Sequence, residues 1–339
     1  MSVVFSGTFS GRFVSTGSNQ FIPLPSGVDW MTVTNETVSY AGGAGSGAMF
    51  TWQAGDANGR GTLYTKEATI GALVPSQIAA ASGFYLLNTS QASIGALNNG
   101  STAITAISTA TPPRVTCGST AGMPTGTVVR LSSIVGADQF NGYDFTITNI
   151  NGTHFDLAYA PTLAVAATAG NFRVVAFNTY WYPAYREMMK VEKSGSGTVP
   201  AGVTRITMSV TQNFTIGQVV TLIVPPQFGM IELNNQTATI VNINQADADG
   251  VTNTIDVDVD SSGFTAFTFP ANGVEFNSAQ VIPVGQDTAT SLAQGQNILA
   301  DATNNTAQFG MLLVAGASSP AGVANDVITW IAGKSFNGV

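Results

Sequence analysis

Residues 140–157 read FNGYDFTITNINGTHFDL, a stretch in which polar and apolar residues alternate for several positions at a time. Alternation with period two is the sequence signal of a half-buried β-strand. The Asn-Gly pairs that begin at Asn141 and Asn151 are dipeptides that tight hairpin turns favour. The stretch therefore predicts antiparallel strands joined by hairpins, and similar text returns as TATIVNIN at 237–244 and NTIDV at 253–257.

A longer comparison indicates that a whole unit is duplicated. Matched residues recur at a nearly constant spacing: Arg114 with Arg205, Gly126 with Gly217, Val128 with Val219, Asn149 with Asn242 and Asp156 with Asp256. The spacing grows only where turns are expected. Lengthening a loop costs little free energy, whereas strand register is tightly constrained, so a true structural repeat should leave this pattern. Each copy is long enough to form a small β-barrel.

Strand-like alternation dominates the rest of the chain as well, which predicts an all-β protein. Both ends of the chain are strand-rich and neither is large enough alone, so we expect them to build one jelly-roll-like β-sandwich with two inserted barrels. Stretches rich in Gly, Ser, Thr and Pro suggest the division: 1–107 plus 270–339 for the sandwich, 108–177 for the first barrel, 178–202 for an aromatic linker and 203–269 for the second barrel. Three separate domains in a row are the alternative. Residues 184–193 fit either one helical turn or an extended linker.

The composition is unusual in its lack of charge. Charged residues make up 9% of the chain, against ~25% in an average soluble protein, while hydrophobic residues make up 44%. The surface must therefore be built largely from Ser, Thr, Asn, Gln and Gly, and few charges remain to repel a neighbouring copy. We expect copies of the chain to assemble, as a trimer or a larger oligomer.

The same inventory excludes several classes of protein. A net charge of −8 with 11 Lys and Arg residues does not favour binding to nucleic acid. The longest apolar runs, such as MLLVAGA at 311–317, are shorter than the ~20 residues that cross a bilayer, so no membrane partner is expected. The first residues lack the features of a signal peptide, and Cys117 is the only cysteine. Together these features predict folding in a reducing cytoplasm.

The motifs of the first copy also occur in a known family. Residues 114–157 carry Arg-Val-Thr, then Met-Pro-Thr-Gly-Thr-Val-Val-Arg-Leu, then the stretch quoted above. This order resembles the repeats of phage tail and virion proteins that are related to the first catalytic-cysteine half-domain of ubiquitin-activating enzymes. The second copy, at 205–267, fits more loosely. The resemblance implies a β-rich, non-enzymatic virion component, and it transfers no catalytic residue because Cys117 does not match a catalytic cysteine.

Acidic residues gather in the second copy. The candidate calcium ligands are two aspartates of a loop and two of the strand after it: Asp247, Asp249, Asp256 and Asp258. Calcium prefers carboxylate oxygens of this kind, although the glycine of the loop is misplaced for an EF-hand. Solvated protection of a sheet edge is the alternative. A pair of glycosidase carboxylates would also need a cleft and a raised pKa.

An aromatic run joins the two copies and ends at an arginine. Its members are candidate interface residues: Tyr180, Trp181, Tyr182, Tyr185 and Arg186. Aromatic residues and arginine are enriched among the anchors of protein interfaces. The run therefore predicts a subunit-contact or sugar-stacking patch, and the alternative is that it fills the gap between barrels and sandwich.

Little in the sequence points to catalysis. His154 is the only histidine, so a catalytic triad or a Cys-His pair with Cys117 would have to use it. An ordinary role on a strand face is the alternative. We assign no catalytic or cofactor-binding residue and expect neither a cofactor nor a metal.

These observations lead to an expected function. We expect a non-enzymatic bacteriophage virion protein, assembled in the host cytoplasm, that acts through contacts with copies of itself and with other virion proteins. It would lie on the capsid surface, as a decoration or head-fibre protein, or on the tail. The alternative is a receptor- or glycan-binding appendage such as a tail fibre or adhesin, whose ligand would be a host surface glycan. A glycan-degrading enzyme is a third class.

Overall fold

The structure is a computed structural model that describes residues 7–25, 27–41, 47–67, 72–88, 102–176, 185–270, 278–285 and 308–334. Within these ranges the chain is almost entirely β-structure. The short helical elements are α1 (Glu36–Ala41), η1 (Asp138–Phe140), η2 (Pro226–Phe228) and η3 (Ile231–Leu233). The strands form two closed six-stranded barrels, one six-stranded sheet and one three-stranded sheet. The predicted all-β fold with small barrels is confirmed, and none of the described helices is long and apolar enough to cross a membrane.

The two ends of the chain build a two-layer sandwich. The larger sheet has the order β1-β21-β3-β4-β5-β6, with bounds Thr8–Val14, Val327–Gly333, Trp30–Asn35, Gly47–Gln53, Thr62–Lys66 and Leu73–Gln77. The smaller sheet has the order β2-β20-β7, with bounds Gln20–Pro23, Gln308–Leu313 and Phe84–Asn88. Neighbouring strands are antiparallel in both sheets.

Alternation along the strands decides which side chains enter the sandwich core. In β3, Met31 and Val33 are buried, while Thr32 and Thr34 face outward. The inward side chains of both sheets share one hydrophobic core, to which β20 contributes Met311. The outer face of the larger sheet consequently carries hydroxyl side chains.

The first barrel, barrel 1, closes in the order β10-β11-β12-β9-β8-β13. Its strands, in chain order from β8 to β13, are Thr102–Ile107, Arg114–Cys117, Val128–Val135, Asp144–Asn151, His154–Leu157 and Ala169–Ala176. The second, barrel 2, contains β14 to β19: Arg186–Glu192, Thr204–Met208, Val219–Ile223, Gln236–Ile243, Thr254–Val257 and Gln280–Pro283. The neighbour order is the same in both barrels when β8 is matched with β14 and each later strand with its successor.

The duplication extends to details of strand pairing. The register shift between Ile104 and Ala106, where β8 meets β9, recurs between Met188 and Lys190, where β14 meets β15. A cross-strand ion pair is also repeated: Arg114 with Asp156 in barrel 1, and Arg205 with Asp256 in barrel 2. These pairs occupy positions that match in the sequence repeat.

The barrels extend beyond the boundaries expected from the sequence. β8 lies in a segment assigned to the sandwich, β14 lies in the segment assigned to a linker, and β19 lies in the stretch 270–339 assigned to the sandwich. A closed barrel needs its first and last strands to pair, and these closing strands carry no recognisable repeat motif. Residues 186–192 are extended and not helical, because β14 pairs with both β15 and β19.

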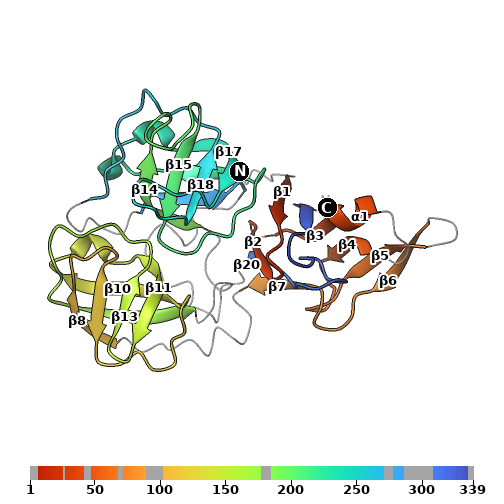
Figure 1. Cartoon of the computed structure of the whole chain (residues 1–339), viewed down its shortest axis with the longest axis horizontal. Helices are drawn as coiled ribbons and strands as arrows, with labels where there is room; N and C mark the ends of the chain where they lie inside the picture. Colours follow the sequence, from red (N-terminus) through yellow and green to blue (C-terminus); the bar gives the residue numbers. More distant parts are fainter. Residues whose placement is uncertain are drawn as a thin grey trace, which may run out of the picture.

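Figure 1 shows the two barrels next to each other, with the sandwich beside barrel 2 and the β5–β6 hairpin extending away from both barrels. The chain leaves the sandwich after β7 and returns to it at β20. The barrel pair is therefore an insertion between strands of one sandwich.

Candidate functional site

The sandwich and barrel 2 meet at a turn of residues 215–218. Ile216 forms an antiparallel bridge with Arg12 of the edge strand β1: the Ile216 N–H donates to the Arg12 carbonyl at 3.1 Å, and the Arg12 N–H donates to the Ile216 carbonyl at 2.7 Å. The Gln218 amide donates to the Pro23 carbonyl in β2 at 2.8 Å. The turn thus contacts both sheets and covers part of an edge that could otherwise pair with another chain.

A glycine and a tryptophan make this close approach possible. Trp330 pairs with Gly11 across β1 and β21, and its Nε1–H donates to the Thr215 hydroxyl at 3.0 Å. A Cβ atom on Gly11 would lie 2.8 Å from the Trp330 ring and would overlap the Thr215 hydroxyl. A residue with a side chain at position 11 would therefore displace the turn of barrel 2.

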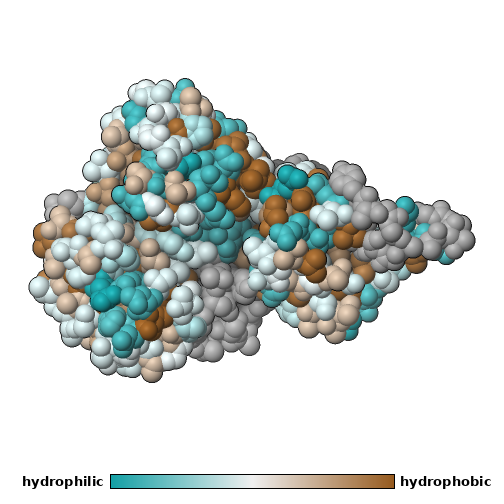
Figure 2. Space-filling view, in the orientation of Figure 1, coloured by the Kyte–Doolittle hydropathy of each residue, from teal (hydrophilic) through white to brown (hydrophobic). Residues whose placement is uncertain are grey.

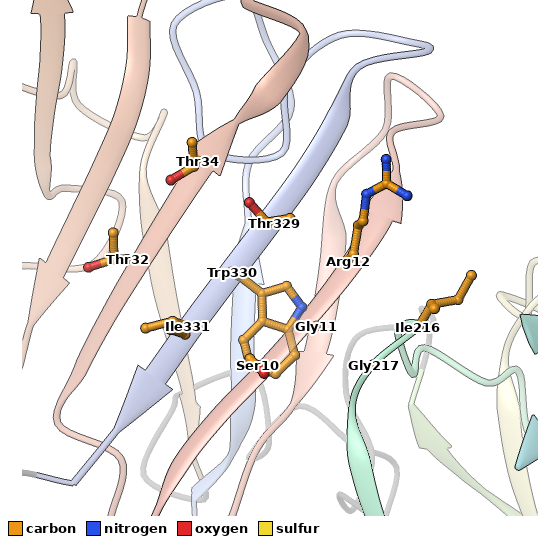
Figure 3. Close-up of a pocket in the computed structure, with 10 residues that line it drawn as sticks. All are labelled: Ser10, Gly11, Arg12, Thr32, Thr34, Ile216, Gly217, Thr329, Trp330 and Ile331. Atoms are coloured by element: carbon orange, nitrogen blue, oxygen red, sulfur yellow. The ribbon is translucent and has the colours of Figure 1, made fainter. Parts of the chain in front are cut away.

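A groove of about 400 Å³ lies at this junction, on the outer face of the larger sheet (Figure 3). Two cross-strand rows form one side of it: Arg12, Thr329 and Thr34 in the first, and Ser10, Ile331 and Thr32 in the second. Ile216 and Gly217 of barrel 2 line the side next to β1. The groove offers hydroxyl groups and one guanidinium beside apolar side chains, which suits a neutral polar ligand or a neighbouring protein surface.

The surroundings of the groove are only partly polar. Figure 2 shows hydrophobic residues on both sides of the junction between barrel 2 and the sandwich. Exposed apolar side chains here include Val14, Ile216, Val219 and Ile331. The described residues that line the groove include no carboxylate, histidine or cysteine, so they supply no general acid or base.

A second candidate site lies between the two barrels, where ionisable side chains are buried. The Arg130 guanidinium donates two hydrogen bonds to the Asp144 carboxylate, both at 2.7 Å. Across the boundary, the Asp144 N–H donates to Glu187 Oε2 of β14 at 2.9 Å. All three residues are buried, so this buried charge cluster fixes how barrel 1 lies against barrel 2.

Burial changes the protonation of this cluster. Removal from water, with the nearby Asp144 carboxylate, raises the pKa of Glu187 to about 8. Burial also raises the pKa of Tyr185 well above its ordinary value. Burial alone would lower the pKa of Arg130, but the Asp144 carboxylate holds it above its ordinary value. Arg130 and Asp144 are thus an ion pair at neutral pH, while Glu187 keeps its proton.

The candidate calcium ligands are divided among different partners. Lys190 Nζ lies 2.7 Å from Asp249 and 3.7 Å from Asp247, whereas Asp256 accepts bonds of 2.7 and 3.0 Å from Arg205. Asp258 accepts a hydrogen bond from the Thr239 N–H at 2.5 Å. Asp247 and Asp249 are brought together around Lys190, and Asp256 and Asp258 are bound elsewhere. Within the described ranges, no group of three or more His, Cys, Asp or Glu side chains is arranged to hold a metal ion.

The structure describes two of the five candidate interface residues. Tyr180, Trp181 and Tyr182 lie outside the described residues. Tyr185 and Arg186 are buried beside the charge cluster, where the Arg186 guanidinium donates to the Tyr185 carbonyl at 2.8 Å and lies 5.8 Å from the centre of the Phe214 ring. Both residues therefore lie where β14 of barrel 2 begins, and both are buried within the chain.

Cys117 and His154 lie on opposite faces of their strands. His154 pairs with Thr116, the neighbour of Cys117, and adjacent residues of a strand point to opposite sides. Cys117 packs in the hydrophobic core, and burial raises the pKa of its thiol. This placement does not favour a Cys-His catalytic pair.

Comparison with protein-family models, curated proteins and solved structures found no match to this chain. Sequence reasoning also did not single out the groove or the buried charge cluster. The groove joins residues from both ends of the chain to a turn of barrel 2, and no local motif marks such an arrangement. The one available signal for the cluster was a pair of opposite charges, Arg130 and Asp144, on two predicted strands of the first repeat.

Proposed function

We propose that this chain is a non-enzymatic structural component of a bacteriophage virion, incorporated in the host cytoplasm, on the capsid surface or on the tail. It acts by holding surfaces in a fixed arrangement and by contacts with copies of itself and other virion proteins. The motifs of its first repeat, which resemble those of phage virion proteins, support this proposal.

The observation that carries the proposal is the way the three units are joined. Barrel 2 is bound to the sandwich by backbone pairing at Ile216 and by the Trp330 and Gln218 side chains. The two barrels are bound to each other by the buried charge cluster. Joints of this kind make a rigid spacer, which suits a component that works by geometry. The low charge of the chain favours packing against neighbours.

The test is quantitative mass spectrometry of purified virions. A structural component should be present in many copies, in a constant ratio to the major capsid or tail proteins. Absence of the chain from purified particles would overturn the proposal.

The groove favours one alternative, a glycan-binding appendage. Hydroxyl rows and the Arg12 guanidinium can bind sugar hydroxyls, and the Ile216 and Ile331 side chains can contact the apolar face of a sugar ring. A few copies per particle, with binding to host glycans that is lost in Arg12→Ala and kept in Lys66→Ala, would support this alternative. Lys66 is an exposed cation of the same sheet outside the groove. Asp256, the carboxylate considered for glycan cleavage, binds Arg205 through both oxygens, which is a structural role.

A further inference from the structure

The turn that docks barrel 2 on the sandwich exists twice in the molecule. Residues 124–127 of barrel 1 match residues 215–218 in the sequence repeat, and Gly126 and Gly217 have positive φ angles of 91° and 81°. Each turn is closed by a bond from its fourth residue to its first: Thr127 N–H to the Pro124 carbonyl and Gln218 N–H to the Thr215 carbonyl, both at 3.1 Å. Both turns have the geometry of type II, with Thr125 where barrel 2 has Ile216.

The two turns are also anchored to their barrels in the same way. Gly126 N–H donates to the Ile147 carbonyl at 3.0 Å, and Gly217 N–H donates to the Ile240 carbonyl at 2.7 Å. Thr125 therefore presents its backbone N–H and C=O outward from barrel 1 as Ile216 presents its own from barrel 2. Ile216 uses these two groups to pair with Arg12, whereas none of the described residues pairs with the backbone of Thr125. Pro124 and Thr125 are exposed.

The sandwich offers a second edge for such a turn. β1 forms one edge of the larger sheet and is covered by Ile216, while β6 forms the other edge and is exposed along its whole length. Bonds from Glu67 N–H to the Ala72 carbonyl and from Ile78 N–H to the Gly61 carbonyl show that the even-numbered residues of this strand face β5. Leu73, Pro75 and Gln77 consequently face the open edge.

Only some residues of the β6 edge can form the backbone bridge of two hydrogen bonds that Arg12 forms with Ile216. Pro75 has no N–H, which limits pairing of a long partner strand with β6. Leu73 and Gln77 each retain an outward N–H and C=O, and a single bridge of the Arg12–Ile216 kind needs one such residue. The turn, PTGT, and β6, LVPSQ, contain no charged residue, so no charge opposes their contact.

We propose that the turn of residues 124–127 binds the β6 edge of a second copy of this chain. Figure 1 shows β6 at the end of the sandwich far from barrel 1, so the contact is between copies and not within one. The contact joins two different surfaces of the molecule, so its repetition either closes a ring of subunits or extends a filament. The proposal rests on the proposed function, because it names one of the subunit contacts through which a virion component would act.

The test is sedimentation velocity of the purified full-length chain over a range of concentrations. Wild type should self-associate. Thr125→Pro should weaken association about tenfold, because it removes one backbone donor and leaves its acceptor unpaired. Proline suits this position of a type II turn, so the fold is kept. Thr125→Ala retains the N–H and should associate as wild type does. The double variant L73P/Q77P, which removes the remaining donors from the β6 edge, should be as weak as Thr125→Pro.

Mixing the two weakened variants gives the sharpest result. Thr125→Pro keeps an intact edge and L73P/Q77P keeps an intact turn, so the mixture should form a one-to-one complex that cannot extend. A monomeric wild type, unchanged association of Thr125→Pro, or a mixture without the complex would overturn the inference. These failures differ from failure of the proposed function, which is measured by the presence of the chain in virions. A chain abundant in particles but monomeric in solution would overturn only the contact proposed here.

Discussion

Barrel 1 and barrel 2 have the same strand order and the same cross-strand Arg–Asp pair, but they differ in what surrounds them. The Arg114 side chain of barrel 1 is 44% exposed, while that of Arg205 in barrel 2 is 4% exposed. The buried Arg130 and Asp144 of barrel 1 are matched in barrel 2 by Thr221 and Thr237, which are uncharged. The docking turn is exposed in barrel 1 and bound in barrel 2. The repeat has therefore kept the features that close a barrel, while each copy has acquired its own contacts.

The largest expected effect concerns the charges that only barrel 1 carries. Arg130→Met leaves the Asp144 carboxylate buried without its cation, and it should lower the free energy of unfolding by about 3–5 kcal/mol. Urea denaturation measures this change. Thr221→Met, at the matching position of barrel 2, is the control and should stay within about 0.5 kcal/mol of wild type. Equal effects of the two substitutions would contradict the view that the buried Asp144 carboxylate depends on the Arg130 cation.

The repeated ion pair gives a second comparison, of one interaction in two environments. Arg205→Met leaves the fully buried Asp256 without a partner and should cost about 3 kcal/mol. Arg114→Met removes a guanidinium that is largely solvated and should cost much less. Melting temperatures of both variants, measured side by side, test the difference. A larger loss in Arg114→Met would show that exposure does not decide the strength of this pair.

A third comparison uses the pH dependence of stability. The pKa of Glu187 is raised from 4.5 to about 8 in the folded protein, so the folded state keeps this proton after the unfolded state has lost it. The stabilisation is fully present below pH 4.5 and is lost as the pH rises toward 8. Glu187→Gln cannot ionise, so it should remove this slope. Urea titrations of both proteins from pH 5 to 9 should diverge as the pH rises, and parallel curves would contradict the assignment.

The sequence predicted the parts of the fold that depend on residues close together in the chain. The Asn-Gly turn at Asn151, the alternation of β11 and the matched positions of Arg205 and Asp256 were all readable because strands and turns leave signals in neighbouring residues. β14 was not predicted as a barrel strand, because REMMKVE contains good helix formers and its extended form depends on pairing with β15 and β19. The groove could not be predicted from the sequence either, because it depends on the register of β1 against β21 and on the contact of Ile216 with β1.

The smallest expected effect tests the docked turn directly. Ile216→Pro removes the N–H that donates to the Arg12 carbonyl and keeps the type II turn, so docking should weaken by about 1 kcal/mol. Hydrogen exchange at the Arg12 amide, which donates to the Ile216 carbonyl, should become roughly fivefold faster because the bridge opens more often. Ile216→Ala retains the N–H, and Thr125→Pro alters the matching turn of barrel 1. Both controls should leave exchange at Arg12 unchanged. If Ile216→Pro also left it unchanged, the edge of β1 would be held by Trp330 and Gln218 alone, and the backbone bridge would not distinguish the two turns.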